Sequence, residues 1–275
     1  MKSYWPESRP FTRLEISGTT TNLISLSGGL IGNHRITVFD KNHPQLADPR
    51  VRQAMTHAID RQAIVDSLWV GRTRVPAGLQ WEYYAEMFQP DWTVPPYDPV
   101  QARELLRAAN YRGDAIPFRV LNNYYTNQVA TAQALVAMWQ AVGLNVQIQM
   151  RENWQQIFDR ATPRAVRDWS NSAPFADPVS SIVNQHGPNG QQQQVGEWTN
   201  AEFNRLSDEL ETSTDRARRK VVFRRLLEIA EREDPAYTVL HQNATFTGKR
   251  KAIEWRPSPS FAMDFRAANF RIARS

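Results

Sequence analysis

One segment of the chain restricts the fold more than any other, because it has the pattern strand, helix, strand. Phe118 to Leu121 is expected to be a short strand, and residues 126–142 place apolar side chains at helical spacing before Gly143. From Leu144 to Met150, apolar and polar residues alternate, as in a half-buried strand. Two strands joined by a helix run parallel with a right-handed crossover, so we predict an α/β fold.

The rest of the chain fits a mixed sheet flanked by helices. Asp48-Pro49 and Asp98-Pro99 have the residues that begin helices, and the first of these helices should run from Pro49 to Trp69. Further helices are expected at 153–160, from Asn200, and from Thr214 or Asp215 to Arg232. Strands are expected at 35–39, 165–171, 237–242 and 245–247, the last two as a hairpin. Loops are expected at 172–199 and at 19–32, the latter with one short strand at Leu23–Leu26.

Several classes of protein are excluded by what the sequence lacks. The chain has 275 residues, enough for one large α/β domain or two smaller ones, and contains no cysteine, which excludes disulfides and cysteine metal sites. No apolar run is long enough to span a membrane as a helix. The first residues, Met1 to Pro6, do not resemble a signal peptide.

The positive net charge of +5 does not predict a nucleic-acid partner. The densest basic run, from Arg216 to Arg225, alternates with apolar residues at helical spacing, which is typical of a solvated helix face. Phe223 is the single aromatic residue within this run, whereas a single-strand stacking surface would require several. We therefore expect no nucleic acid among the partners.

No motif for catalysis or for a cofactor is present. The five histidines form no HExxH motif, and neither GxSxG nor a phosphate-binding P-loop occurs. Gly28, Gly29 and Gly32 form only a weak GGxxG with no helix after it, and no spacing pairs two carboxylates for acid–base work. We expect no catalytic residues, no metal ligands and no cofactor.

Aromatic residues are the most distinctive part of the composition, with 9 tryptophans, 8 tyrosines and 12 phenylalanines. Many lie in an irregular, proline-rich stretch at 72–97. Trp81, Trp92, Trp169 and Trp198 lie in loops or at strand ends, where each by itself fits core packing. As a group they indicate a concave site for an organic ligand.

Several motifs in order resemble one family. Asp48 to Ala54 (DPRVRQA) continues to Ala58 to Arg61 (AIDR), and Pro96 to Leu106 reads PYDPVQARELL. Gln133 to Leu135 leads to Val142 to Val146, and Asp177-Pro178, Trp198 to Asn200 and Asp234-Pro235 follow. This set resembles the family 5 extracellular solute-binding proteins, the dipeptide/oligopeptide-type periplasmic binding components of ABC importers.

The resemblance implies a periplasmic-binding-protein-like fold (type II, cluster C-like) and a two-lobed protein that is longer than this chain. We expect residues 1–34 to be the remnant of the first lobe, 35–245 the C-terminal ligand-binding lobe, and 246–275 a tail returning toward the first lobe. The chain would then be a C-terminal-lobe fragment, periplasmic, with its signal peptide removed together with the N-terminal part. Its implied partners are a small-molecule or peptide ligand and the importer's permease subunits, and it would act as a monomer.

The resemblance also points to ligand-binding residues. In the peptide-binding members, a Trp followed three residues later by Asp lies near the ligand's ammonium group; Trp169 matches, but Ser172 replaces the acid, and a hydroxyl cannot pair with an ammonium as a carboxylate does. Asp168 or Asp177 could take that role, and Arg164 or Arg167 could meet an anionic group. The expected ligand-binding residues are Trp169, Ser170, Asn171, Arg167, Ser172, Tyr83, Tyr84 and Trp198.

The ligand class stays open at this point, since the family also imports sugars, opines and nickel complexes. Two other functions are alternatives to solute binding. A hydrolase acting on a polysaccharide or peptide would need a paired acid and base, which the sequence does not show. A domain binding nucleic acid or an anionic surface would show binding that depends steeply on salt.

Overall fold

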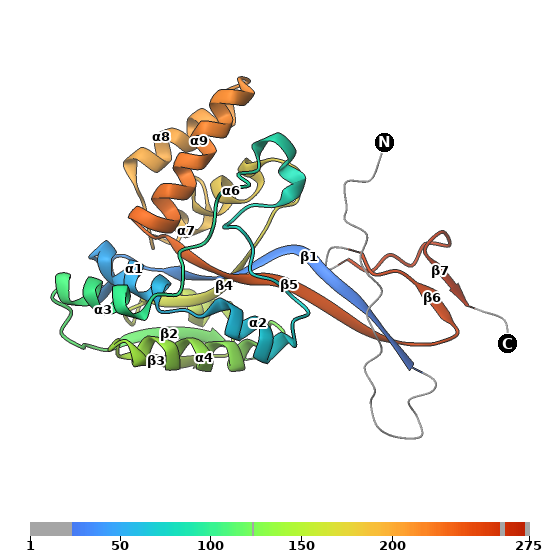
Figure 1. The fold of residues 1–275 in the computed structure, drawn as a ribbon, viewed down its shortest axis with the longest axis horizontal. Coiled ribbons are helices and arrows are strands. Elements are labelled where there is room, and N and C mark those ends of the chain that lie inside the picture. Colours follow the sequence, from blue (N-terminus) through green and yellow to red (C-terminus); the bar gives the residue numbers. More distant parts are fainter. Residues whose placement is uncertain (1–23, 123, 259–261, 273–275) are drawn as a thin grey trace.

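The computed structural model describes residues 24–122, 124–258 and 262–272. A five-stranded mixed sheet lies at its centre, in the order β3-β2-β4-β1-β5, with helices on both faces (Figure 1). Its strands are β1 (Ile24–Phe39), β2 (Ile116–Leu121), β3 (Val146–Arg151), β4 (Val166–Ser172) and β5 (Tyr237–Arg250). The predicted α/β class is confirmed.

The predicted strand–helix–strand unit is present. β2 and β3 are parallel, with Ile116 opposite Val146 and Leu121 opposite Arg151, and α4 (Gln128–Ala141) connects them. β4 runs parallel to β2, while β1 is antiparallel to both β4 and β5. The last residues of β2, β3 and β4 therefore lie along one edge of the sheet, which we name the carboxyl edge.

Each face of the sheet buries its own core, because successive side chains of a strand point to opposite faces. On one face, Phe39 and Leu240 pack with apolar residues of α1 (Pro49–His57), α2 (Arg61–Trp69), α3 (Pro99–Ala108) and α4. On the other, Ile36 and Val239 pack with α6 (Ile182–His186), α8 (Ala201–Thr212), α9 (Arg216–Glu228) and the irregular segment that contains η3 (Glu82–Met87). Figure 1 shows these two helical layers above and below the sheet.

The helix expected over 49–69 is in fact two helices. α1 ends at His57, and the Asp60 side chain accepts a hydrogen bond from the backbone N–H of Ala63, which makes Asp60 the N-cap of α2. An aspartate side chain that bonds a nearby backbone N–H is favoured at a helix N-cap over the interior of a helix, so one helix ends before Asp60 and another begins after it. The expected N-caps Asp48 and Asp98 are confirmed.

Several further expectations differ from the structure in the number or length of their helices. The expected loop at 172–199 contains η4 (Pro178–Ser180), α6 and α7 (Gln191–Gln194). α5 covers only Trp154–Phe158, and α9 continues into a five-residue π-helix, η5 (Ile229–Glu233). Loop-rich composition did not reveal these single-turn helices, because their stability comes from tertiary contacts rather than from propensity.

The strands expected at 35–39, 237–242 and 245–247 are present, but β1 extends back to Ile24 and β5 is one continuous strand, so the two form a long antiparallel pair in place of the expected hairpin. Ile24 pairs with Arg250, whereas β4 pairs only with residues 33–39 of β1. The outer part of the pair is therefore a two-stranded ribbon, which leads away from the helices toward β6 (Ile253–Trp255) and β7 (Phe270–Ile272) (Figure 1). Apart from Ile24 to Ser27, where apolar and polar residues alternate, its Ser, Gly and Thr residues carry no strand pattern, so the sequence did not predict its full length.

Within the described residues, no helix combines the length and the apolar character that crossing a membrane would require.

Candidate functional site

Aromatic side chains gather just past the carboxyl edge. The Trp154 ring contacts Tyr124 at 4.8 Å and Trp169 at 4.7 Å between centroids, and Phe158 contacts Trp169 at 6.0 Å. All three contacts are edge-to-face, the geometry that aromatic pairs favour. We name Tyr124, Trp154, Phe158 and Trp169 the aromatic wall. In open α/β sheets, ligands bind outside the carboxyl ends of the strands, so the wall is the candidate site.

Three different strands bring the wall together. Tyr124 follows β2, Trp154 and Phe158 belong to α5 directly after β3, and Trp169 lies in β4. Asn153 caps α5 by accepting from the backbone N–H of Gln156, which starts the helix at Trp154. Trp154 and Phe158 then share one side of α5, because they are four residues apart. Tyr124 is 58% exposed, so the wall is open to solvent at that end.

Two serine hydroxyls lie at the end of β4, on the face opposite the Trp169 side chain. Asn33 of β1 donates through Nδ2 to Ser170 Oγ at 3.1 Å and to Ser172 Oγ at 2.7 Å. Asn243 of β5 donates in turn to Asn33 Oδ1. Ser172 is exposed and Ser170 half-buried, so both hydroxyls stand where a ligand could compete for or share these bonds. The structure thus places Ser170 and Ser172 together on one face of β4, whereas the Trp169 side chain lies on the other face with Arg167.

Arg167 is on the opposite face of β4 from these serines and is already paired. Its Nε donates to both carboxylate oxygens of Glu197, at 2.8 and 3.0 Å, and Nη2 donates to Oε2 at 2.9 Å. The two side chains are 3% and 2% exposed. The guanidinium also lies 4.6 Å from the Trp169 ring centroid. Arg167 therefore supports Trp169 from behind, and Arg164 is similarly paired with Asp40 at 3.0 Å.

The two acidic residues considered as substitutes for the missing carboxylate are also paired. Asp168 is buried, forms an ion pair with Arg35 and accepts from Gln128 Nε2 at 2.7 Å. Burial raises the pKa of Asp168, while the Arg35 charge and these hydrogen bonds oppose that rise. Asp177 accepts from both terminal nitrogens of Arg219, at 2.8 and 2.9 Å. Each of the two carboxylates thus already has a cationic partner.

The remaining candidates near β4 are held by internal hydrogen bonds. Asn171 is buried 3.4 Å from Nε2 of His186. The Tyr84 hydroxyl lies 2.7 Å from Ser181 Oγ, with the side chain 2% exposed. Burial raises the pKa of Tyr84. Tyr83 is half-buried and donates to the carbonyl of Ala173 at 2.8 Å, so its ring lies near the end of β4.

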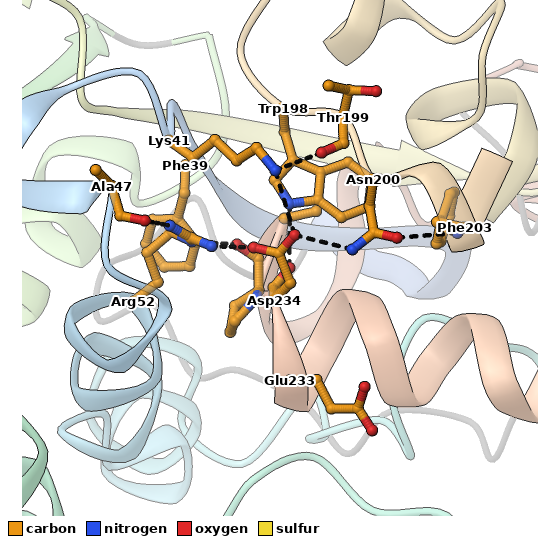
Figure 2. A network of polar contacts seen from close by, with 12 residues as sticks. Phe39, Lys41, Ala47, Arg52, Trp198, Thr199, Asn200, Phe203, Glu233 and Asp234 are labelled. Carbon is orange, nitrogen blue, oxygen red and sulfur yellow. Dashed lines mark hydrogen bonds and ion pairs between the residues drawn. The ribbon is translucent and has the colours of Figure 1, made fainter.

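Trp198 lies at the opposite edge of the sheet from the aromatic wall. Its indole Nε1 donates to the carbonyl of Asp234 at 3.1 Å, within the network of Figure 2. There the Asp234 carboxylate pairs with Arg52, with Lys41 at 3.3 Å and with Asn200 at 3.1 Å. Arg52 and Asp234 belong to the first and last motifs of the resemblance, so these motifs build scaffold rather than a ligand site.

The other tryptophans singled out from the sequence are core residues. Trp81 and Trp92 are each 1% exposed, and Trp92 Nε1 donates to the buried carboxylate of Glu231 at 3.0 Å. Glu231 also accepts from the backbone N–H of Leu79 and from the Tyr237 hydroxyl. The aromatic-rich segment 72–97 is thus anchored to the core, and most of its aromatic residues fill space.

Sequence reasoning missed Tyr124, Trp154 and Phe158. The signal that could have found them is position: each comes shortly after a predicted parallel strand, where the connecting loops of neighbouring strands converge. Their residue types alone were uninformative, because aromatics occur throughout this chain.

The chain is similar in sequence to known proteins. The sequence model of the bacterial extracellular solute-binding proteins, family 5, matches residues 13–191. The di/tripeptide-binding protein 1 of Pseudomonas aeruginosa is 25% identical over 253 residues, which are 86% of this chain and 45% of that protein. The dipeptide-binding protein of Escherichia coli is 25% identical over 251 residues, covering 85% and 44%. The chain thus spans about half the length of these relatives.

Solved structures show the same fold. A dipeptide-binding protein from Pseudoalteromonas in complex with Met-Leu superposes with a TM-score of 0.76 at 21% identity, over 92% of this chain and 51% of that one. NikZ from Campylobacter jejuni in complex with Ni(L-His) gives 0.73 at 14% identity, over 86% and 50%. The fold is therefore that of periplasmic binding proteins. The chain belongs to the bacterial extracellular solute-binding proteins of family 5.

Proposed function

We propose that this chain is the ligand-embracing lobe of the solute-binding component of an ABC importer. Residues 35–245 form the lobe, and residues 1–34 and 246–275 connect it with a first lobe. A small polar solute is captured between the two lobes in the periplasm, and closure around it delivers the solute to the permease subunits. Family membership and the periplasmic-binding-protein fold support this proposal.

The observation that carries the proposal is the position of the aromatic wall. Partly exposed rings stand at the carboxyl edge, on the strand end that also carries the hydroxyls of Ser170 and Ser172 on its other face, and next to the ribbon that leaves the lobe. An aromatic contact contributes about 0.5–1.5 kcal/mol beyond the area that it buries. A wall of this kind favours a solute with an apolar or planar face and a few hydrogen-bonding groups.

The ligand proposed is a peptide or a similar small polar solute. Arg167, Arg164, Asp168 and Asp177 are each paired within the protein, so they supply no free charge for a peptide terminus. At this end of the site, recognition therefore rests on Trp169 and the serine hydroxyls. Any charged terminus of the solute is then recognised elsewhere.

The charges of α9 support a binding protein over a nucleic-acid binder. Arg218 pairs with Glu209 at 2.5 Å, Arg219 with Asp177, and Arg225 with Glu202 at 2.9 Å and with Glu233 at 2.6 Å. Cations that already have carboxylate partners on the surface give little attraction for a phosphate backbone. This agrees with the solvated helix face expected from the sequence.

A thermal-shift screen tests the proposal. The full-length protein is mixed with free dipeptides, N-blocked dipeptides, opines, oligosaccharides or nickel chelates, one class at a time. A bound solute at 100 times its dissociation constant adds about 2.7 kcal/mol of stability, which raises the melting temperature measurably. Stabilisation by one class supports the solute receptor and identifies its cargo. Absence of stabilisation by every class contradicts the proposal.

A further inference from the structure

Arg119 is a buried cation that lies close to the aromatic wall and that the ligand site does not use directly. It lies in β2 and is 1% exposed. Among the described residues it forms no ion pair with a carboxylate. Burying a charge costs several kcal/mol unless hydrogen bonds satisfy it. The hydrogen-bond acceptors around the Arg119 guanidinium offset that cost.

All of the acceptors belong to one stretch of chain. Nη1 donates to the carbonyl oxygens of Ile157 at 2.8 Å, Asp159 at 2.7 Å and Gln156 at 3.4 Å. Nη2 donates to the Thr162 carbonyl at 2.9 Å, to Thr162 Oγ1 at 2.6 Å and to the Pro163 carbonyl at 3.3 Å. One guanidinium therefore holds the segment 156–163, which contains the end of α5 and its connection to β4.

This segment needs such an anchor. α5 is only five residues long, too short to be stable by itself, and its last carbonyls have no partner within the helix. A cation at the C-terminal end of a helix satisfies those carbonyls and interacts favourably with the helix dipole. The same helix carries Trp154 and Phe158, whose rings contact Trp169.

We propose that Arg119 is a positioning residue for ligand binding: by fixing segment 156–163 it holds Trp154 and Phe158 edge-on against Trp169. The inference rests on the proposed function only in treating the aromatic wall as the surface that meets the solute. A merely structural Arg119 would contribute to stability without setting the geometry of the Trp154–Trp169 pair.

Circular dichroism reports that geometry directly. The two indole rings are 4.7 Å apart with an interplanar angle of 81°, and transitions of two indoles so close and so inclined couple into a paired positive and negative band. The difference between the spectra of the wild-type chain and Trp154→Phe isolates this couplet. In Arg119→Lys we expect most of the couplet to be lost from the folded protein, because one ammonium cannot bridge carbonyls that the planar guanidinium holds on two sides.

Arg61→Lys is the matched control. Arg61 is 5% exposed and donates to the carbonyls of Val239 at 2.6 Å and Pro95 at 2.9 Å and to Thr238 Oγ1 at 2.8 Å. It is thus another buried arginine held by carbonyls and a threonine hydroxyl, but none of these partners is in α5. We expect Arg61→Lys to lower the melting temperature and to keep the couplet.

Thr162→Val supplies a milder variant, since it removes only the hydroxyl acceptor at 2.6 Å. We expect a folded protein with a reduced couplet. The proposal is overturned if folded Arg119→Lys keeps the wild-type couplet, or if Arg61→Lys loses as much of it. If Arg119→Lys does not fold, an unchanged couplet in Thr162→Val overturns it. No solute is present in these spectra, so this outcome is separate from that of the solute screen.

Discussion

The buried pair Arg167–Glu197 gives the sharpest quantitative prediction, because it decides whether Arg167 belongs to the scaffold or to the ligand. Both side chains are almost fully buried and share three hydrogen bonds of 2.8 to 3.0 Å. Removing one partner of such a pair leaves a buried charge without compensation, which typically costs about 3–5 kcal/mol. Arg167→Met also loses the guanidinium–ring contacts with Trp169 and Phe158, about 0.5–1 kcal/mol each.

The double variant Arg167→Met/Glu197→Met should be much less destabilised than the two single variants together. Replacing both partners with apolar residues of similar size removes the desolvation cost as well as the attraction, and such replacements are often close to neutral. We expect the free energy of unfolding of the double variant to lie within about 2 kcal/mol of the wild-type value. The coupling energy from the cycle should then be at least about 3 kcal/mol.

Urea unfolding followed by far-ultraviolet circular dichroism gives the four free energies of the cycle. The same four proteins are titrated with the solute found in the thermal-shift screen, and the double variant should retain wild-type affinity. Single variants that each cost less than about 1 kcal/mol, with additive effects, would refute the assignment of Arg167 to the scaffold. So would a double variant that is stable but no longer binds the solute.

Two further predictions concern stability. Burial lowers the pKa of His186 to about 3 and that of His241 to about 4, below their unfolded-state value of about 6.5. The stability that each neutral histidine contributes is fully present above pH 6.5 and is lost as the pH falls toward its folded pKa. By pH 4, protonation of each should lower the free energy of unfolding by about 3 kcal/mol, which is measured as a falling urea midpoint. In His186→Gln the urea midpoint should fall less steeply with pH. Asp234→Asn should cost about 2 kcal/mol, since it leaves buried Arg52 without its carboxylate, and solute affinity should not change; an affinity loss would contradict the scaffold assignment.

The sequence predicted the parts of the fold that are set by local patterns. The spacing of apolar residues in 118–150 predicts β2, α4 and β3 and the crossover that joins them. The aspartates before Pro49 and Pro99 cap their helices as expected. Short strands within β1 and β5 were predicted, but their pairing into one long ribbon was not, because it joins segments more than 200 residues apart rather than following a local pattern.

The ligand-binding role of the candidate residues stays a prediction, and the sequence could not show which of the charged ones are paired. Nothing in the sequence shows that Arg167 faces Glu197 or that Asp168 faces Arg35, since those partners are 30 and 133 residues away. From the sequence alone, a charged residue on a strand could equally well bind the solute or form a buried ion pair. Only the register of β1 against β4 and the path of the chain after α7 decide between the two.

The central claim is that the aromatic wall at the carboxyl edge binds the solute, and titration calorimetry with two tryptophan variants tests it most directly. The solute that stabilises the protein most in the screen is titrated into the wild type, Trp169→Ala and Trp198→Phe. The account predicts at least about a tenfold loss of affinity for Trp169→Ala, equivalent to about 1.4 kcal/mol, and wild-type affinity for Trp198→Phe. Wild-type affinity in folded Trp169→Ala would contradict it.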